Sequence, residues 1–209
     1  MTICARNLQL LAPCLHDLPD YNSMSDKDVR YRHRHVDLMV TSGVRDVFVQ
    51  RAKVIKLLRK YLDERDFIEV ETPMLAEHAG GAIAKPFETF IHSHNTKLYM
   101  RIAPELYLKQ LIMGGMDRVY EIGKSFRNEG TDLTHNPEFT TVEFYQAYEN
   151  YEGMLNTTEE LLRTIAMGLC GPKVTLNIPA RGVIKAQTVE VDFNAPFRES
   201  CACQNLLTI

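Results

Sequence analysis

The sequence predicts an α+β fold, in which helices and an antiparallel sheet come from separate stretches of the chain. Apolar residues recur at three- and four-residue steps over 44–62, as they do in an amphipathic helix. Residues 117–128 and 139–148 instead alternate between apolar and polar side chains, as half-buried strands do. The connection 130–138 predicts that these two strands form one long antiparallel hairpin.

Length and composition favour a globular protein without a membrane partner. The chain has 209 residues, of which 45% are hydrophobic, and these suffice for a real core. No apolar run reaches the roughly 18 residues of a membrane helix, and the first residues lack the pattern of a secretory signal. The five cysteines are irregularly spaced, which predicts free thiols in a reducing, cytoplasmic compartment; Cys201 and Cys203 form a close pair without zinc-ligand spacing.

Charge is unevenly distributed along the chain. Residues 26–65 are rich in Lys and Arg, whereas residues 128–162 contain acidic side chains and no Lys or Arg. The basic stretch could meet phosphate and the acidic stretch could hold a cation. Composition alone favours the simpler interpretation, in which both stretches are solvated faces.

The elements before residue 90 follow from local patterns. Residues 8–12, LQLLA, predict a short strand that leads into a loop. Residues 67–75, FIEVETPML, alternate as a strand, and Pro73 ends it or places it at a sheet edge because proline cannot donate a ladder hydrogen bond. The loop 77–86 contains Gly80 and Gly81, which could let a ligand approach the main chain; a plain turn is an equal alternative.

The later elements are marked by proline, glycine and capping residues. Residues 97–101 predict a strand, and a helix follows with Pro104 at its first position and glycines at its end. Glu105 falls in the first turn of this helix, where capping by the helix dipole competes with a functional role. A further helix is expected over 153–167, with Asn156–Thr158 as cap candidates and Gly168 as its end, before a last strand, TVEVDF.

The predicted hairpin brings polar side chains together on one surface. Its alternation places Tyr120, Ile122, Val142, Phe144 and Tyr148 toward a core, and Glu121, Arg127, Glu143 and Tyr145 on the opposite face. One arginine among carboxylates suits a ligand that carries both an anion and an ammonium group. A cross-strand salt-bridge ladder is the alternative, which pattern alone slightly favours.

At this point the residues resemble a known family. The run at 101–148, which begins RIAPELYLKQLIMGG, strongly resembles class II lysyl-tRNA synthetases, and its wording DLTHNPEFT is closest to the eukaryotic cytosolic type. FRNEG at 126–130, with HNPEFTTVEFY after it, resembles motif 2 of that family. The segment that ends in FIEVETPML resembles motif 1, and RYRHRHVDL at 30–38 resembles the linker before the catalytic domain.

The resemblance implies a class II aminoacyl-tRNA synthetase catalytic core, an antiparallel sheet flanked by helices. Residues 1–25 would be a remnant of the anticodon-binding barrel and linker, 26–198 a partial catalytic domain, and 199–209 a tail outside the family pattern. It also implies lysine–tRNA ligase activity: ATP and L-lysine give lysyl-adenylate, and tRNA(Lys) then receives the lysyl group. A homodimer through motif 1, and possibly a multi-synthetase assembly, would go with it.

The family's site residues carry over by position. Arg127 would be catalytic, holding the α-phosphate of ATP and the lysine carboxylate as charge develops. The ATP-binding residues would be Arg127, Glu129, His135, Asn136 and Phe139. The lysine-binding residues would be Gly81, Glu105, Arg127, Glu143 and Tyr145. Asp132 and Glu138 are interpreted as loop structure.

The sequence also departs from the family pattern. Motif 3, with its γ-phosphate arginine, has no counterpart, and neither have the later carboxylates that hold Mg²⁺, so the core is expected to be incomplete at its C-terminal side and no metal ligand is assigned. We therefore expect little activity from this chain alone. The alternative is a non-catalytic module that keeps the motif 1 dimer surface and acts in interactions; a tRNA-binding fragment is a weaker third possibility.

Overall fold

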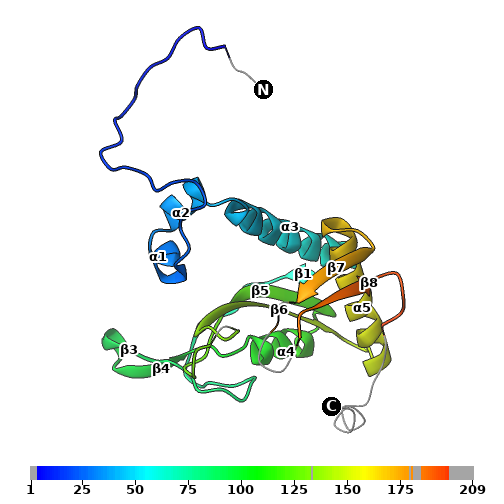
Figure 1. Ribbon diagram of the computed structural model, residues 1–209. Coiled ribbons are helices and arrows are strands. Elements are labelled where there is room, and N and C mark those ends of the chain that lie inside the picture. Colours follow the sequence, from blue (N-terminus) through cyan, green and yellow to red (C-terminus); the bar gives the residue numbers. More distant parts are fainter. Residues whose placement is uncertain (1–3, 133, 179, 181–184, 198–209) are drawn as a thin grey trace. The chain divides into compact units, whose positions relative to one another are not determined.

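The computed structural model describes residues 4–132, 134–178, 180 and 185–197 (Figure 1). The chain divides into two compact units between Lys53 and Val54. The predicted 199–209 tail and the pair Cys201 and Cys203 lie outside the described residues. The described cysteines, Cys4, Cys14 and Cys170, are free thiols, as predicted.

The first unit contains two short helices and the start of a long one: α1 (Lys27–Arg32), α2 (Arg34–Val40) and α3 (Val44–Asp63). The strand predicted at 8–12 is wrong: this segment is irregular, and Leu8 is 96% exposed. A strand needs a partner to satisfy its backbone groups. None of the described strands pairs with it.

One buried carboxylate organises α1 and α2. Asp37 is fully buried and accepts hydrogen bonds from Arg30 Nε at 2.7 Å and Arg34 Nη1 at 3.1 Å. The hydrogen bond from Arg30 holds the pKa of Asp37 below its usual value. The segment RYRHRHVD therefore contains a buried carboxylate paired with two arginines, while its residues 31–33 and 35 are exposed.

The second unit is built on a three-stranded sheet in the order β1-β5-β6. Its strands are β1 (Ile68–Glu69), β5 (Arg118–Phe126) and β6 (Glu138–Gln146). The predicted β5–β6 antiparallel hairpin is confirmed. Strand β1 lies parallel to β5, so the sheet is mixed rather than purely antiparallel.

Two smaller sheets complete the unit. One has the order β2-β4-β3 and the other pairs β7 with β8. Their bounds are β2 (Leu75–Ala76), β3 (Glu88–Ile91), β4 (Thr96–Met100), β7 (Lys173–Ile178) and β8 (Gln187–Asp192), and the 3-10 turn η1 (His92–His94) joins β3 to β4. The sequence predicted β4 and β8, but β3 and β7 were missed.

The two helices of this unit are α4 (Glu105–Met113) and α5 (Tyr151–Leu169). Pro104 is the N-cap of α4 and Gly114 its C-cap, close to the prediction. Helix α5 starts earlier than predicted, because Asn150 caps it by accepting from Gly153 N at 2.8 Å. The predicted end at Gly168 is also wrong, since this residue lies inside the helix.

The core lies between the sheet and helices α3 and α5. Leu58, Tyr61 and Leu62 of α3 pack there with Leu161 of α5 and Tyr120 of β5, and Ile122, Val142 and Phe144 join the cluster, as the alternation predicts. Tyr148 was wrongly assigned to this face, because it follows the end of β6 and is fully exposed. Helix α4 contacts β5 and β6 from the other side of the sheet (Figure 1).

Candidate active site

The face of the β5–β6 hairpin that turns away from the core carries the predicted polar residues; we call it the site face. It consists of the odd-numbered residues of 119–125 and 139–145, because side chains alternate across a sheet. The register sets Glu121 directly opposite Glu143, and Ser125 opposite Phe139. The prediction that Glu121, Glu143 and Tyr145 share one face is thereby confirmed, whereas Arg127, predicted for the same face, follows the end of β5 and lies outside this register.

The segment 101–105, between β4 and α4, joins the site face to the neighbouring elements. Arg101 N donates to Met74 O at 2.8 Å, and Arg101 O accepts from Phe126 N at 2.9 Å. Ile102 O accepts from Arg127 Nε at 3.5 Å. The N-terminus of α4 is therefore fixed beside the end of β5.

Arg127 is half-buried and is positioned by Phe139. Its guanidinium carbon lies 5.0 Å from the centre of the Phe139 ring, a cation–π contact, and its backbone N–H donates to Pro137 O at 2.9 Å. Among the described residues, only Nε of its guanidinium has a hydrogen-bond partner. The terminal nitrogens are thus available to a phosphate or carboxylate group.

Gly81 and Glu105 meet at the start of α4. Gly81 has φ +90°, and a Cβ built there would lie 3.0 Å from Glu105 Cβ and 3.4 Å from Ala103 Cβ. Only a residue without a side chain allows so close an approach. Glu105 Oε1 accepts from Lys109 Nζ at 2.6 Å, so its carboxylate already binds an ammonium group in this structure.

Glu143 and Tyr145 form a half-buried polar pair on β6. The Tyr145 hydroxyl donates to Glu143 Oε2 at 3.1 Å. Burial raises the pKa of Glu143, and the negative charges of Glu105 and Glu121 raise it further. Burial likewise raises the pKa of the Tyr145 hydroxyl, which therefore stays protonated as a donor. A cationic group at this point would relieve the repulsion between the carboxylates.

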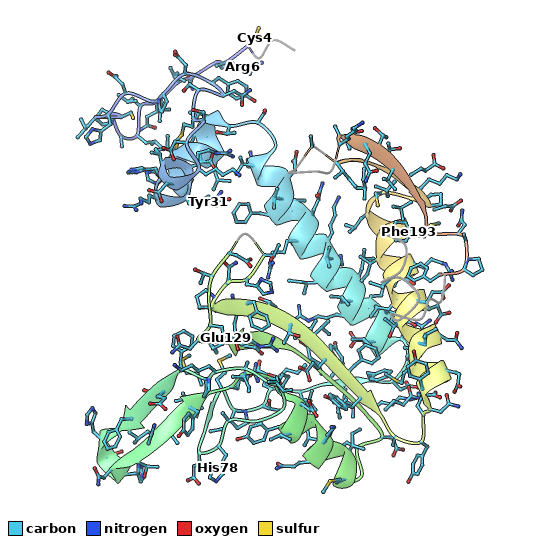
Figure 2. The ribbon with its side chains drawn as sticks, turned by 60° about the horizontal axis from the view of Figure 1, so that its bottom comes forward. Cys4, Arg6, Tyr31, His78, Glu129 and Phe193 are labelled. Carbon is cyan, nitrogen blue, oxygen red and sulfur yellow. The ribbon has the colours of Figure 1, made fainter. Side chains whose placement is uncertain are left out.

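The loop between β5 and β6 holds the other predicted residues, all of which are exposed: Glu129, His135 and Asn136. Glu129 lies beside the β5–β6 ribbon (Figure 2), and its Oε1 accepts from Lys85 N at 3.3 Å. Asn128 N donates to Lys85 O at 2.7 Å. The loop is therefore joined to the glycine-containing loop 77–86.

Asp132 gives this loop its shape. Its Oδ1 accepts from Thr134 N at 2.6 Å and from His135 N at 2.9 Å, and the His135 ring lies 3.0 Å from the carboxylate. These hydrogen bonds, that from Thr134 N first, hold the pKa of Asp132 well below its usual range. Glu138 pairs with Lys124 at 2.8 Å. Asp132 is loop structure, as interpreted from the sequence, whereas Glu138, interpreted in the same way, is the first residue of β6.

Sequence reasoning missed Arg101. It is 4% exposed and forms an ion pair with Glu121, which is 3% exposed. The available signal was a lone arginine in the apolar run LYMRIA, since a buried arginine requires a counter-charge. Glu121 had been placed on the correct face but without its partner.

The described residues contain neither a metal-ligand cluster nor a membrane-spanning helix. No group of three or more His, Cys, Asp and Glu side chains there could hold a metal ion, so we assign no Mg²⁺ ligand and derive no step through this ion. Within the same ranges, no helix is both long enough and apolar enough to cross a bilayer.

Comparison with known proteins identifies the family. The sequence profile of the tRNA synthetases of class II (D, K and N) matches residues 26–200. The chain belongs to this family. The α+β class and the class II synthetase core expected from the sequence are thereby confirmed.

The similar curated proteins are named as lysine–tRNA ligases. A probable cytoplasmic lysine–tRNA ligase of Vairimorpha ceranae is 48% identical over 197 residues, which is 94% of this chain and 38% of that protein. The lysine–tRNA ligase of Mycoplasma mobile is 48% identical over 199 residues, 95% of this chain and 39% of that protein. Lysine–tRNA ligase cla4 of Cladosporium cladosporioides is 52% identical over 172 residues, 82% of this chain and 29% of that protein. The chain thus spans less than half the length of these relatives.

Proposed function

We propose that the chain provides the lysine- and ATP-binding face of a lysine–tRNA ligase. In this reaction the lysine carboxylate attacks the α-phosphate of ATP, which releases pyrophosphate and leaves lysyl-adenylate. The ribose hydroxyl at the end of tRNA(Lys) then attacks the lysyl carbonyl and releases AMP. The chemistry needs positioned charges rather than a covalent enzyme nucleophile.

The observation that carries this proposal is the arrangement of charges around the N-terminus of α4. Glu105 and Glu143 lie close enough for their charges to interact. Arg127 is attached to the same segment through Ile102 O. Two carboxylates beside one arginine match a ligand with two ammonium groups and one carboxylate, and lysine is such a ligand. The names of the relatives support the same substrate.

Each residue then has a role that its surroundings allow. Glu105, with the backbone at Gly81, binds the α-ammonium group, and Glu143 with Tyr145 binds the side-chain ammonium group. Arg127 binds the carboxylate and the α-phosphate, so that it stabilises the charge that develops between them. Phe139, held by Arg127, stacks on the adenine, while Glu129, His135 and Asn136 contact the adenosine from the loop.

The test compares two first-turn carboxylates. We expect Glu105→Gln to weaken L-lysine binding by about ten- to hundredfold, because a charged hydrogen bond contributes about 1.5–3 kcal/mol, and to change ATP binding little. Glu152→Gln is the matched control, since Glu152 occupies the first turn of α5 and loses the same helix-dipole interaction. Calorimetric titration of the 209-residue chain with each ligand measures both affinities.

Two results would count against the proposal. A wild-type chain that binds neither lysine nor ATP would remove the proposed function of this face. Equal losses of lysine affinity in the two glutamine variants would reduce Glu105 to a helix-capping residue. A loss confined to Glu105→Gln, and to lysine, supports the assignment.

The partners belong to the same proposal. Lysine, ATP and tRNA are the substrates that a lysine–tRNA ligase uses, and Mg²⁺ accompanies ATP in the class II enzymes. The homodimer through residues 44–75, an assembly with other synthetases and a cytoplasmic location stay predictions. The location is supported by the name of the Vairimorpha ceranae relative.

A further inference from the structure

A buried ion pair, Arg101–Glu121, lies on the site face beside the proposed lysine-binding residues. Arg101 Nη1 donates to Glu121 Oε1 and, at 3.1 Å, to Thr72 Oγ1. Glu121 Oε2 accepts from the same threonine hydroxyl at 2.6 Å. Arg101 Nε donates to Lys124 O at 2.7 Å. Both charged side chains are therefore fixed by several hydrogen bonds, as a buried pair requires.

The guanidinium of Arg101 extends over the site face. A Cβ added at Gly123 would overlap Arg101 Nη2, so this nitrogen lies directly above the strand between the positions of Glu121 and Ser125. Nη2 is buried and has no hydrogen-bond partner among the described residues. Because Gly123 of β5 has no side chain, the Arg101 guanidinium can lie directly against the strand at this position.

This placement matters because of the strand register. Glu121 and Glu143 are directly opposed on β5 and β6, and like charges in this position repel. The charges of Glu105 on α4 and Glu121 on β5 raise the pKa of Glu143 on β6, whereas the charge of Arg101 lowers it. The three carboxylates and one guanidinium have a formal net charge of about −2, counted without Lys109, which is bound to Glu105.

We infer that the Arg101–Glu121 pair is a positioning device that sets the charge of the lysine site. By neutralising Glu121, Arg101 leaves Glu143 and Glu105 for the two ammonium groups of the substrate, and in this structure Glu105 is bound to Lys109 instead. Arg101 touches no substrate atom in this arrangement; it acts through Glu143 and through its backbone bonds to residues 74 and 126. The inference rests on the proposed lysine-binding function.

The electrostatics of Glu143 agree with this arrangement. Burial is the largest influence that raises its pKa, followed by a hydrogen bond from Tyr145 that lowers it. The charges of Glu105 and Glu121 raise the pKa, whereas the charge of Arg101 lowers it. Removal of Arg101 would therefore favour the protonated, uncharged form of Glu143, which binds an ammonium group poorly.

A charge-swap series tests the inference by calorimetric titration of the 209-residue chain with L-lysine and with ATP. Glu121→Gln leaves Arg101 unneutralised and reduces the net charge from about −2 to about −1, so lysine affinity should fall tenfold or more. The double variant R101Q/E121Q restores the wild-type charge, and lysine affinity should return to within a few-fold of wild type. ATP affinity should change less than twofold throughout.

The control is a second cross-strand pair of the same hairpin. Lys124 and Glu138 are joined at 2.8 Å but are half-exposed and lie on the even-numbered positions, which point away from the site face. Glu138→Gln removes the same charge from the same hairpin, and we expect no change in lysine affinity. A fall equal to that of Glu121→Gln would overturn the inference.

Gly123→Ala tests the position of the Arg101 guanidinium without changing the charge of any residue. The new methyl group must displace the guanidinium, and we expect lysine affinity to fall several-fold while ATP affinity stays the same. This variant keeps the test decisive if the glutamine variants fail to fold, because unchanged lysine affinity in Gly123→Ala would refute the inference.

The series also separates the two proposals. A wild-type chain that does not bind lysine contradicts the proposed function itself. A wild-type chain that binds lysine, with a double variant no better than Glu121→Gln, contradicts only the role of the ion pair. Equal losses of lysine and ATP affinity in the double variant would assign Arg101 to general stability instead.

Discussion

Gly81→Ala should weaken lysine binding through the backbone alone. Gly81 has φ +90°, where a residue with a side chain is strained by about 1–3 kcal/mol. The added methyl group would also meet Glu105 Cβ at 3.0 Å. The loop can relieve both effects by moving away from α4, but bound lysine requires it to return. The strain then opposes binding, which corresponds to a loss of affinity of about 5- to 150-fold.

Gly115→Ala is a control that introduces the same backbone strain at a position away from Glu105 and the proposed lysine site. Its φ is +97°, close to that of Gly81, but an added Cβ there meets no atom within 4 Å. Gly115→Ala should therefore lower the melting temperature without changing the lysine affinity. Calorimetric titration with lysine and ATP, together with thermal unfolding of both variants, separates the two effects.

The reasoning fails if Gly81→Ala binds lysine within twofold of wild type while its stability falls as much as that of Gly115→Ala. Gly81 would then be part of an ordinary turn, which was the alternative interpretation of this loop from its sequence. A parallel loss of ATP affinity would instead indicate a wider disturbance of the loops that meet at Lys85.

Two further perturbations address Arg127 and Asp37. Arg127→Ala should lower lysine-dependent ATP–pyrophosphate exchange of the active enzyme by about 10²–10³-fold. Arg118→Ala, at the other end of β5, is the control. Near-normal exchange would limit Arg127 to packing against Phe139. Asp37→Asn should lower thermal stability at pH 7. Because the folded-state pKa of Asp37 is lowered, its contribution is present above its unfolded pKa of about 3.9 and is lost as pH falls through the folded value. The melting difference should therefore shrink below about pH 4, and a constant difference down to pH 2 would contradict the assignment.

The parts of the fold that the sequence predicts are those with long periodic patterns. Helix α3 and the β5–β6 hairpin each repeat their pattern over nine or more residues, so local preference and burial agree. The strand expected at 8–12 fails for the opposite reason, because a mostly apolar run of five residues does not show whether a partner strand exists. The early start of α5 at Asn150 shows how a cap competes with apolar periodicity in setting a helix end.

In the candidate site, too, features set by local sequence could be predicted, whereas contacts between distant residues could not. The alternation on β5 and β6 predicts which residues share the site face, because side-chain direction in a strand is local. The approach of Gly81 to Glu105 depends on how the loop 77–86 returns to α4, and no spacing in the sequence contains that information. Arg101 was missed because a buried arginine is recognised only through the carboxylate that neutralises it, and Glu121 is twenty residues away in sequence.

The register of the hairpin gives the strongest argument that this surface binds a cationic ligand. Two glutamates directly opposite each other on neighbouring strands destabilise a sheet, and burial of one of them adds to that cost. Arg101 offsets one charge, and the hydroxyl of Tyr145 partly satisfies the other. Among the described residues, the repulsion between Glu105 and Glu143 is partly offset by Lys109 of α4, whose ammonium group is bound to Glu105. A ligand with two ammonium groups would supply the missing positive charge, and the same ligand would exchange places with Lys109.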